Sequence, residues 1–491
     1  MLKRFLVRSF SSRLSYPFKK DYPAPTHTVQ SFRSSFTSLL AGARQTDSPC
    51  VLVGRIASIR ESSSKLVFYS LSAPLDPTVS LQIMADAQYY DAVHGPFSEA
   101  VQNVKRGDYV CIEGFPGKSQ KGELSIFPRK VTVLAPCLHS LPSHDGLADP
   151  NLRYRNRHLD MIVDGRRVVK AIEARNHVYG VIRRVLSQNG FTEVETPMLQ
   201  WLAGGANARP FKTAMDSFGR DHLQMELRIA PELFLKQLVI GGLERVFELG
   251  RQFRNEGADA THNPEFTTCE FYGAHLDADD MASLAETIVC QILGWPATRR
   301  PFPRLSFVDT IEQETKDLMP ADLSDEDAIR QFCSKHHALP SSKPYTVSRC
   351  LDSLAEKFIE PLCDPEFCTF IVDHPIALSP LAREHPDLTK RKRGLSHRFE
   401  LFLARKEIAN GYSELNRPDE QKLRFDAQKE QQKKGDAEAR TGADEDFVKA
   451  LEFGLPPTGG CGLGIDRLVM SLCQEKHIRD VLLFPLMRPQ A

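Results

Sequence analysis

The sequence predicts an α+β fold in which a small N-terminal β-barrel precedes one large domain of mixed strands and helices. The first observation is length, because 491 residues exceed one typical domain and suit about two to four. The second is a series of short strand-like segments between about residues 49 and 135. The third is the alternation of strand-like and helix-like segments over the rest of the chain.

Residues 46–136 are predicted to form the barrel. Five segments there are rich in β-branched, aromatic and other apolar residues and are separated by Gly, Ser, Pro and Asp: Val51–Val53, Leu66–Tyr69, Val79–Met84, Tyr109–Glu113 and Leu124–Phe127. About five strands in such a short stretch are typical of a small barrel such as an OB-fold. We expect residues 137–160, which contain Pro and His, to be a linker.

Residues 161–491 are predicted to form the large domain. Apolar residues recur at helical spacing over residues 166–188, and Asn189-Gly190 is a typical helix stop. Residues of about 312–360 also have a helical pattern and are expected to be an insertion. The sequence contains neither GxxxxGK[ST] nor GxGxxG, so any nucleotide must be bound by another architecture.

Composition narrows the class of protein. The chain is 41% hydrophobic and 26% charged, which fits a globular protein. The sequence contains no run of about 18 apolar residues, so it does not predict a membrane span. The formal net charge of +0 neither supports nor excludes binding to RNA. Eleven cysteines are scattered without a CxxC pair, which favours reduced, buried thiols over a zinc site.

The first 45 residues are expected to be a targeting segment and extension. The first twenty carry six basic residues and several serines, and no acid occurs before Asp21. On a helix, Leu2, Phe5, Leu6 and Phe10 would share an apolar face opposite the arginines. This composition predicts a mitochondrial transit peptide and a location in the mitochondrial matrix. The alternative is a basic tail that touches RNA.

A long hairpin is predicted within residues 245–275. Its strand-like arms, Arg245–Arg254 and Phe266–His275, are joined by a polar loop with Gly and Pro. Because side chains alternate between the faces of a strand, one face of the second arm carries Phe266, Thr268, Glu270 and Tyr272. These residue types favour the floor of a polar pocket. The alternative is an amphipathic hairpin with its polar face in solvent.

Three segments resemble the sequence motifs of class II aminoacyl-tRNA synthetases, in the right order. Gly190–Pro197 resembles motif 1, the dimer motif. Phe253–Gly257 with His262–Thr267 resembles motif 2, and Gly464–Arg467 resembles motif 3. This resemblance implies a catalytic domain built on an antiparallel sheet flanked by helices, and a homodimer formed through motif 1. Together with the barrel, it implies the subgroup that charges aspartate, asparagine and lysine.

Further segments are similar to lysyl-tRNA synthetases: Gly204–Phe211, Arg228–Leu233 and Asn410–Asn416. This resemblance implies activation of lysine with ATP, then transfer to tRNA(Lys). It places a set of residues around the amino acid: Gly205, Glu232, Glu270, Tyr272, Asn410 and Glu414. A buried ammonium needs acceptors, so these acids fit lysine, whereas an aspartate site would need cations there.

The same resemblance assigns residues to the nucleotide and the metal. Arg254 and Arg467 are implied as catalytic, and ATP contacts are implied for Arg254, Glu256, His262, Asn263, Phe266 and Arg467. The motif 2 arginine would stabilise charge at the α-phosphate. Glu400 and Glu407 match magnesium ligands, because Mg²⁺ prefers carboxylate and phosphate oxygens.

In the barrel, the same resemblance matches three residues to the positions with which the family reads the anticodon: Phe68, Gln82 and Glu123. An exposed aromatic on a barrel strand can stack on an unpaired base, although Phe68 taken alone fits a core position. The basic run Lys390–Arg393 suits either tRNA backbone contacts or a solvated loop. Two rival functions are a lysine-modifying relative acting on protein and an inactive RNA-binding or signalling protein. The barrel argues against the first, and the full set of acids and arginines against the second.

Overall fold

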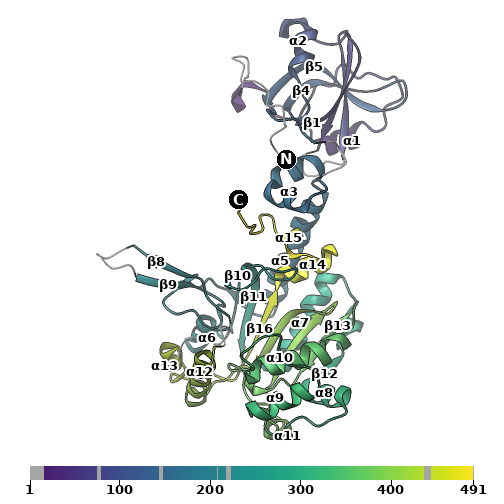
Figure 1. Ribbon diagram of the computed structural model, residues 1–491. Helices are drawn as coiled ribbons and strands as arrows, with labels where there is room; N and C mark the ends of the chain where they lie inside the picture. Colours follow the sequence, from purple (N-terminus) through teal and green to yellow (C-terminus); the bar gives the residue numbers. More distant parts are fainter. Residues whose placement is uncertain are drawn as a thin grey trace. The chain divides into compact units, whose positions relative to one another are not determined.

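The computed structural model describes residues 16–73, 79–142, 147–206, 208–216, 223–435 and 444–489. The basic leader predicted to target the protein lies largely outside these residues. The chain divides into two compact units, Met1–Lys170 with Leu483–Ala491 and Ala171–Leu482 (Figure 1). A barrel in the first unit and a large mixed sheet with helices in the second confirm the predicted α+β fold.

The first unit contains a closed barrel with strand order β1-β2-β3-β5-β4. Its strands are β1 (Cys50–Ser63), β2 (Leu66–Ser72), β3 (Ser80–Asp86), β4 (Tyr109–Lys118) and β5 (Leu124–Ala135), with α2 (Phe97–Asn103) between β3 and β4. Buried and partly buried residues alternate along β2 and β3, so one set of side chains fills the barrel and the other faces outward. Four of the five predicted strand segments lie within one of these strands, and the fifth, Val79–Met84, begins one residue before β3.

Helix α1 (Val29–Phe36) belongs to the barrel, although its residues fall in the predicted N-terminal extension. Val29 and Phe32 are buried in the barrel core, and Arg33 donates to the carbonyl of Ser80 at 2.8 Å. Thr28 caps the helix by accepting from the amide of Ser31. Residues from Val29 onward therefore belong to the barrel unit rather than to a separate N-terminal extension.

The expected linker, residues 137–160, contains α3 (Pro150–Arg155) and the start of α4 (Arg157–Asp164). Asp149 caps α3, and a proline occupies its first turn, where no amide hydrogen bond is lost. The chain from Leu483 onward packs here, because Arg157 Nε donates to the carbonyl of Leu483 at 2.7 Å.

The second unit is built on an eight-stranded sheet of order β12-β13-β14-β15-β16-β11-β10-β6. These strands are β12 (Arg304–Ser306), β13 (Cys368–Val372), β14 (Arg398–Leu403), β15 (Lys406–Ser413), β16 (Thr458–Gly464), β11 (Glu265–Ala274), β10 (Arg245–Phe253) and β6 (Thr192–Glu193). All neighbours are antiparallel except the pairs at the two edges. The predicted hairpin is the β10–β11 pair.

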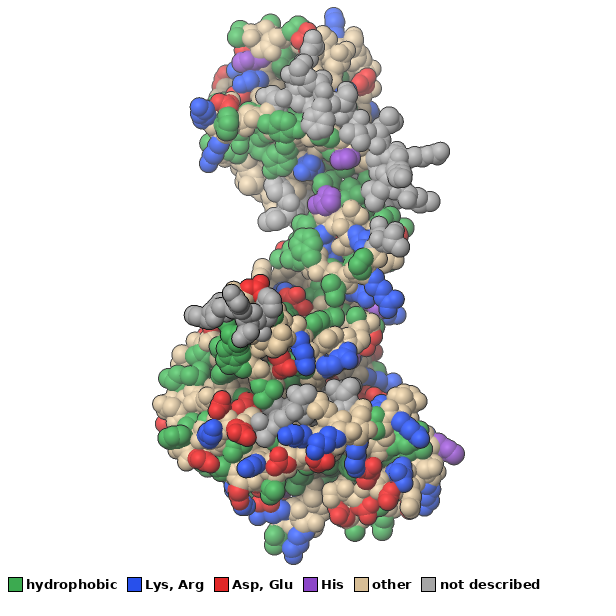
Figure 2. Space-filling model, turned by 60° about the vertical axis from the view of Figure 1, so that its left-hand side comes forward, with side chains coloured by type: hydrophobic (Ala, Val, Ile, Leu, Met, Phe, Trp, Pro, Cys, Tyr) green, Lys and Arg blue, Asp and Glu red, His purple; other side chains and the backbone are tan. Residues whose placement is uncertain are grey.

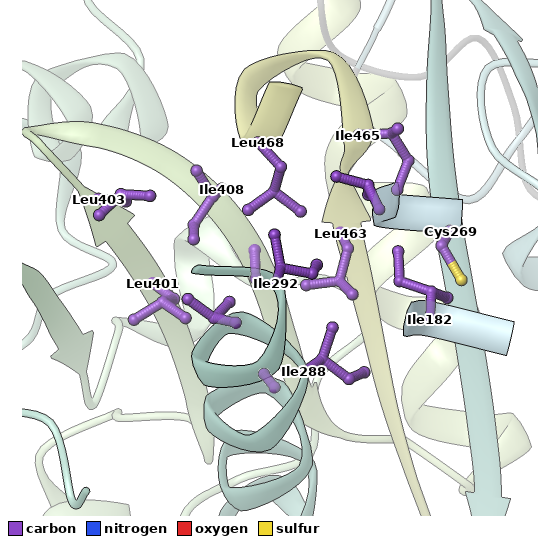
Figure 3. Close-up of a cluster of buried hydrophobic side chains, with 14 of the residues drawn as sticks. Ile182, Cys269, Ile288, Ile292, Leu401, Leu403, Ile408, Leu463, Ile465 and Leu468 are labelled. Atoms are coloured by element: carbon purple, nitrogen blue, oxygen red, sulfur yellow. The ribbon is translucent and has the colours of Figure 1, made fainter. Parts of the chain in front are cut away.

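One face of this sheet is covered by α5 (Arg166–Gln188), α7 (Ala278–Leu293) and α14 (Ile465–Cys473). Figure 3 shows the resulting core: Ile182 of α5, Ile288 and Ile292 of α7, and Leu468 of α14 meet Leu463 of the sheet. The spacing predicted for residues 166–188 is therefore the buried stripe of α5. This packing leaves the opposite face of the central strands to form a site.

Helices α9 (Glu326–Lys335) and α10 (Val347–Phe358) lie in the expected insertion, and α8 (Phe307–Thr315) overlaps its start. All three share one core with β13 and β14. A smaller sheet has the order β7-β9-β8. Its strands are β7 (Leu199–Gln200), β8 (Lys212–Met215) and β9 (Leu223–Leu227). The remaining helices are α6 (Glu232–Ile240), α11 (Leu388–Lys392), α12 (Pro418–Lys433), α13 (Glu445–Leu451) and α15 (Ile478–Val481).

The neutral net charge reflects mixing rather than a lack of charge. Figure 2 shows basic and acidic side chains interspersed over the face drawn there. Among the described residues, no helix combines the length and apolar character that crossing a membrane requires. All eleven cysteines are free thiols, and ten of them are buried.

Candidate functional site

A cavity of about 410 Å³ opens in the second unit, against β11, β14, β15 and β16. Its walls include all but one of the site residues predicted for the large domain: Gly205, Glu232, Arg254, Glu256, His262, Asn263, Phe266, Glu270, Tyr272, Glu400, Glu407, Asn410 and Arg467. The exception is Glu414. The predicted face of β11 faces this cavity, so the solvent-facing alternative for the hairpin is wrong.

One end of the cavity is acidic. Tyr272 donates its hydroxyl hydrogen to Glu270 at 3.0 Å, and Tyr412 donates to Glu232 at 2.8 Å. Burial and the nearby Glu232 carboxylate raise the pKa of Glu270 to about 8. An entering cation would reverse this effect by favouring the ionised carboxylate. This end of the cavity therefore suits a ligand with ammonium groups.

Gly205 closes the wall beside Glu232. Its φ of +90° is disfavoured for other residues, and an added Cβ would lie 3.0 Å from the Cβ of Glu232. The backbone can therefore approach Glu232 closely only because the residue is glycine.

Glu414 is absent from the residues that line the cavity, but its carboxylate lies against one of them, on the same face of β16 as Tyr272. A Cβ added at Gly460, which lines the cavity, would lie 2.1 Å from Glu414 Oε1. The Glu414 carboxylate forms an ion pair with Lys236, and both side chains are 0% exposed. The Glu414 carboxylate, which was expected to contact a ligand directly, is therefore already paired with a cation of the protein itself. Sequence reasoning missed Lys236, although it lies four residues after Glu232, one helical turn away.

The other end of the cavity combines cations with an aromatic ring. The Arg254 guanidinium lies 5.1 Å from the centre of the Phe266 ring. Arg467 contacts His262 Nε2 at 2.9 Å and donates to the carbonyl of Glu407 at 2.7 Å. A ring for stacking and two guanidiniums for negative oxygens are what a nucleoside polyphosphate requires.

Glu400 and Glu407 are on the adjacent strands β14 and β15 and both line the cavity. Burial would raise the pKa of Glu400, but the charges of His374 and Arg398 lower it to about 2. Arg398 was not predicted, yet it also donates to Asn410 Oδ1 at 3.1 Å and to Glu400 Oε1 at 2.6 Å. The sequence does contain a signal for Arg398: it lies two residues before Glu400, so both side chains point to the same face of one strand.

In the barrel, Phe68 of β2 and Gln82 of β3 alternate with the buried residues of their strands, so they lie on the outer face. Ser125 donates to Gln82 at 2.9 Å and to the carbonyl of Glu123 at 3.2 Å, which brings these positions together. Arg60, which was not predicted, lies opposite Phe68 with its guanidinium 4.7 Å from the ring centre. The face combines a ring, a cation and polar groups.

The basic run Lys390–Arg393 is largely engaged inside the protein. Lys390 contacts Asp373 at 2.7 Å, and Arg393 contacts Glu312 at 2.8 Å. Arg391 lies 3.4 Å from Glu384. These ion pairs favour a structural role over contact with a nucleic-acid backbone.

Comparisons with known proteins agree with this arrangement. Residues 149–488 match the family model described as tRNA synthetases class II (D, K and N), and residues 50–134 match an OB-fold nucleic acid binding domain. A lysine–tRNA ligase of Cladosporium cladosporioides is 40% identical over 99% of this chain and 84% of its own length. A probable cytoplasmic lysine–tRNA ligase of Encephalitozoon cuniculi is 41% identical over 89% and 87%. A lysine–tRNA ligase of Streptococcus suis is 43% identical over 79% of each chain.

Proposed function

Because the chain belongs to the class II tRNA synthetases of the D, K and N group, and within it to the lysine–tRNA ligases, we propose that it activates lysine and charges tRNA(Lys) for mitochondrial translation. A carboxylate oxygen of lysine attacks the α-phosphorus of ATP, and the bond to the β-phosphate oxygen breaks. Pyrophosphate leaves. A hydroxyl of the terminal tRNA ribose then attacks the lysyl-adenylate carbonyl, and AMP leaves.

The acidic end of the cavity is the observation that carries the choice of lysine. Glu232 and Glu270, with Tyr272, are acceptors for the two ammonium groups of the amino acid. Aspartate and asparagine lack the side-chain ammonium that would offset the burial of Glu270. We assign Glu232 and Gly205 to the α-ammonium, Glu270, Tyr272 and Glu414 to the side chain, and Asn410 to the carboxylate.

The nucleotide is assigned to the cationic end of the cavity. Phe266 stacks on adenine from one side and Arg467 covers the other. Arg254 stabilises the charge that develops at the α-phosphorus. Glu256, His262 and Asn263 line the same end. No general base is required in the first step, because the attacking carboxylate is already ionised.

Mg²⁺ fits the donor set of this end. Mg²⁺ is commonly held by one or two carboxylates together with phosphate oxygens, and Glu400 and Glu407 offer two such carboxylates beside the nucleotide site. When bound, the ion would neutralise charge on the phosphates. Glu400 stays ionised over the physiological pH range because Arg398 and His374 lower its pKa.

The outer face of the barrel is the proposed anticodon site. Phe68 would stack on an unpaired base, and Gln82 and Glu123 would read hydrogen-bonding groups. The presence of such a barrel in the same chain as a catalytic domain also distinguishes this proposal from a lysine-modifying enzyme that acts on protein.

A second copy of the chain is the proposed partner at motif 1. Met198, Leu199 and Trp201, which follow that motif, are 46%, 48% and 63% exposed. Neighbouring exposed apolar side chains favour a protein interface. Analytical ultracentrifugation should give twice the mass of the chain, and Trp201→Arg should shift it toward the monomer. A wild-type monomer would refute this assignment.

The mitochondrial location rests on the basic, acid-free leader. The first twenty residues fused to a fluorescent reporter should enter mitochondria, and a fusion with the same arginines changed to glutamine should not. A wild-type fusion that stays cytosolic would leave the basic-tail alternative.

Lysine-dependent exchange of pyrophosphate into ATP tests the activity. The protein should support exchange with lysine and not with aspartate or asparagine, and should charge tRNA(Lys). No exchange with any of these amino acids would favour an inactive RNA-binding or signalling protein.

A further inference from the structure

A row of polar side chains links the loop between β10 and β11 to α14 at the nucleotide end of the cavity. Its first member, Asp259, has no role in the proposed reaction so far. Asp259 Oδ2 lies 2.8 Å from His262 Nδ1, and His262 Nε2 lies 2.9 Å from the Arg467 guanidinium. Arg467 in turn donates to the carbonyl of Glu407 at 2.7 Å. His262 and Arg467 line the cavity, whereas Asp259 reaches it only through the histidine ring.

The hydrogen-bonding capacity of these groups fixes the tautomer of His262. A guanidinium can only donate hydrogen bonds, so His262 Nε2 accepts from Arg467. A neutral imidazole carries one N–H, which is therefore on Nδ1 and donates to the Asp259 carboxylate. The Thr261 hydroxyl lies 3.1 Å from the same Nδ1 and fits this assignment, because it can donate its hydrogen to Asp259 Oδ1 at 3.2 Å. Asp259 thus decides which ring nitrogen faces Arg467.

Asp259 is itself held in place by the backbone of its own loop. Its Oδ1 atom accepts from the amides of Thr261 at 2.7 Å and His262 at 2.8 Å, which leaves Oδ2 directed at the ring. Burial would raise the pKa of Asp259, but these amides and the His262 ring lower it to about 2 by hydrogen bonding. The side chain is therefore an ionised acceptor over the physiological pH range.

We propose that Asp259 is a positioning residue for ATP, which acts through His262 on Arg467. Its carboxylate keeps the Nδ1–H of His262 turned toward the loop, so the Nε2 lone pair is directed at Arg467. Glu407 accepts from the same guanidinium, and Arg467 is thereby fixed between two acceptors at the end of the cavity assigned to the nucleotide. This inference rests on the proposed function, because it concerns the ATP of that reaction.

Asp259→Asn tests the role of the second oxygen. The asparagine keeps one oxygen for the amides of Thr261 and His262 but presents an NH2 group to the ring. His262 Nδ1 then has to become an acceptor, which moves the ring N–H to Nε2, where it opposes an N–H of Arg467. We expect the ATP KM in pyrophosphate exchange to rise about tenfold, a loss typical of one hydrogen bond to a charged group. The lysine KM should stay near the wild-type value.

Asp322→Asn is the matched control. Asp322 Oδ1 accepts from the amide of Ser324, two residues further on, at 2.8 Å and from its hydroxyl at 2.6 Å. Asp259 Oδ1 has the same two contacts with Thr261. Asp322 lies between α8 and α9, and no histidine ring contacts its other oxygen among the described residues. The same substitution at this position should leave both KM values unchanged.

A double-mutant cycle with His262→Ala separates an effect through the histidine from a local effect on the loop. His262→Ala should itself raise the ATP KM. Asp259→Asn should add nothing in that background, because the side chain through which it acts is gone. Calorimetric titration of the full-length protein with ATP gives the same comparison as dissociation constants and does not depend on turnover.

Three results would overturn the inference. These are wild-type ATP affinity in Asp259→Asn, an equal further loss in the His262→Ala background, and a lysine KM that rises in parallel with the ATP KM. A wild type that binds ATP but shows no lysine-dependent exchange would instead overturn the proposed function, and the calorimetric cycle would still decide the role of Asp259.

Discussion

Glu270 should make lysine binding depend on pH in the neutral range. The residue is 8% exposed, and burial and the nearby Glu232 raise the pKa of its carboxyl group to about 8. In the free enzyme it is therefore mostly protonated at pH 7. Lysine needs the ionised form, because a carboxylate pairs with its side-chain ammonium and a carboxylic acid does not. Binding should release a proton, and affinity should rise as the pH approaches 8.

The size of the effect follows from the raised pKa. With a pKa of about 8, roughly one tenth of the sites are ionised at pH 7 and one half at pH 8. If bound lysine keeps Glu270 ionised, the lysine KM should fall about fivefold between pH 7 and pH 8. Below pH 7 it should change by about tenfold per pH unit. The α- and side-chain ammoniums of lysine remain largely charged over this range, so they add little to the dependence.

Pyrophosphate exchange at saturating ATP, with lysine varied between pH 6.5 and 8, measures this slope. Glu270→Gln should raise the KM at every pH and flatten its pH dependence. Calorimetry in buffers of different ionisation enthalpy should detect nearly one proton released per lysine bound at pH 7 by the wild type and none by the variant. A KM that is flat in the wild type, or equally steep in Glu270→Gln, would refute this account.

Other parts of the molecule give equally direct tests. Phe68→Ala should weaken tRNA aminoacylation by about 1–3 kcal/mol and leave lysine-dependent exchange intact; equal losses would make Phe68 a packing residue. Glu407→Gln should raise the ATP KM far more than the lysine KM, because Glu407 lies at the nucleotide end beside Arg467. Deletion of residues 2–20 should leave the midpoint of denaturant unfolding unchanged. Phe32→Ala, by contrast, should destabilise the barrel by about 3–5 kcal/mol, because it removes a fully buried side chain. A similar loss in the deletion would show that the leader is part of the fold.

Much of this molecule could be predicted because the relevant information is local. The spacing of apolar residues identified α5, and clusters of turn residues separated the five barrel strands. Strict alternation along β11 put Glu270 and Tyr272 on one face, and the structure places that face against the cavity. Alternation and helical spacing are properties of the backbone itself, so they can be read without knowing what packs against each element.

Partnerships between distant segments could not be read in this way. The pairing of Lys236 with Glu414 depends on how α6 packs against β10 and β11, and the packing of α1 into the barrel depends on a core made by other strands. The sequence alone does not indicate an ion-pair partner for Lys390 or Arg393. In the structure they pair with Asp373 and Glu312, which belong to other segments of the chain. Side-chain type and periodicity fix the direction in which a residue points. Only the assembled packing decides which charge it meets there, as the buried ion pair between Glu414 and Lys236 shows.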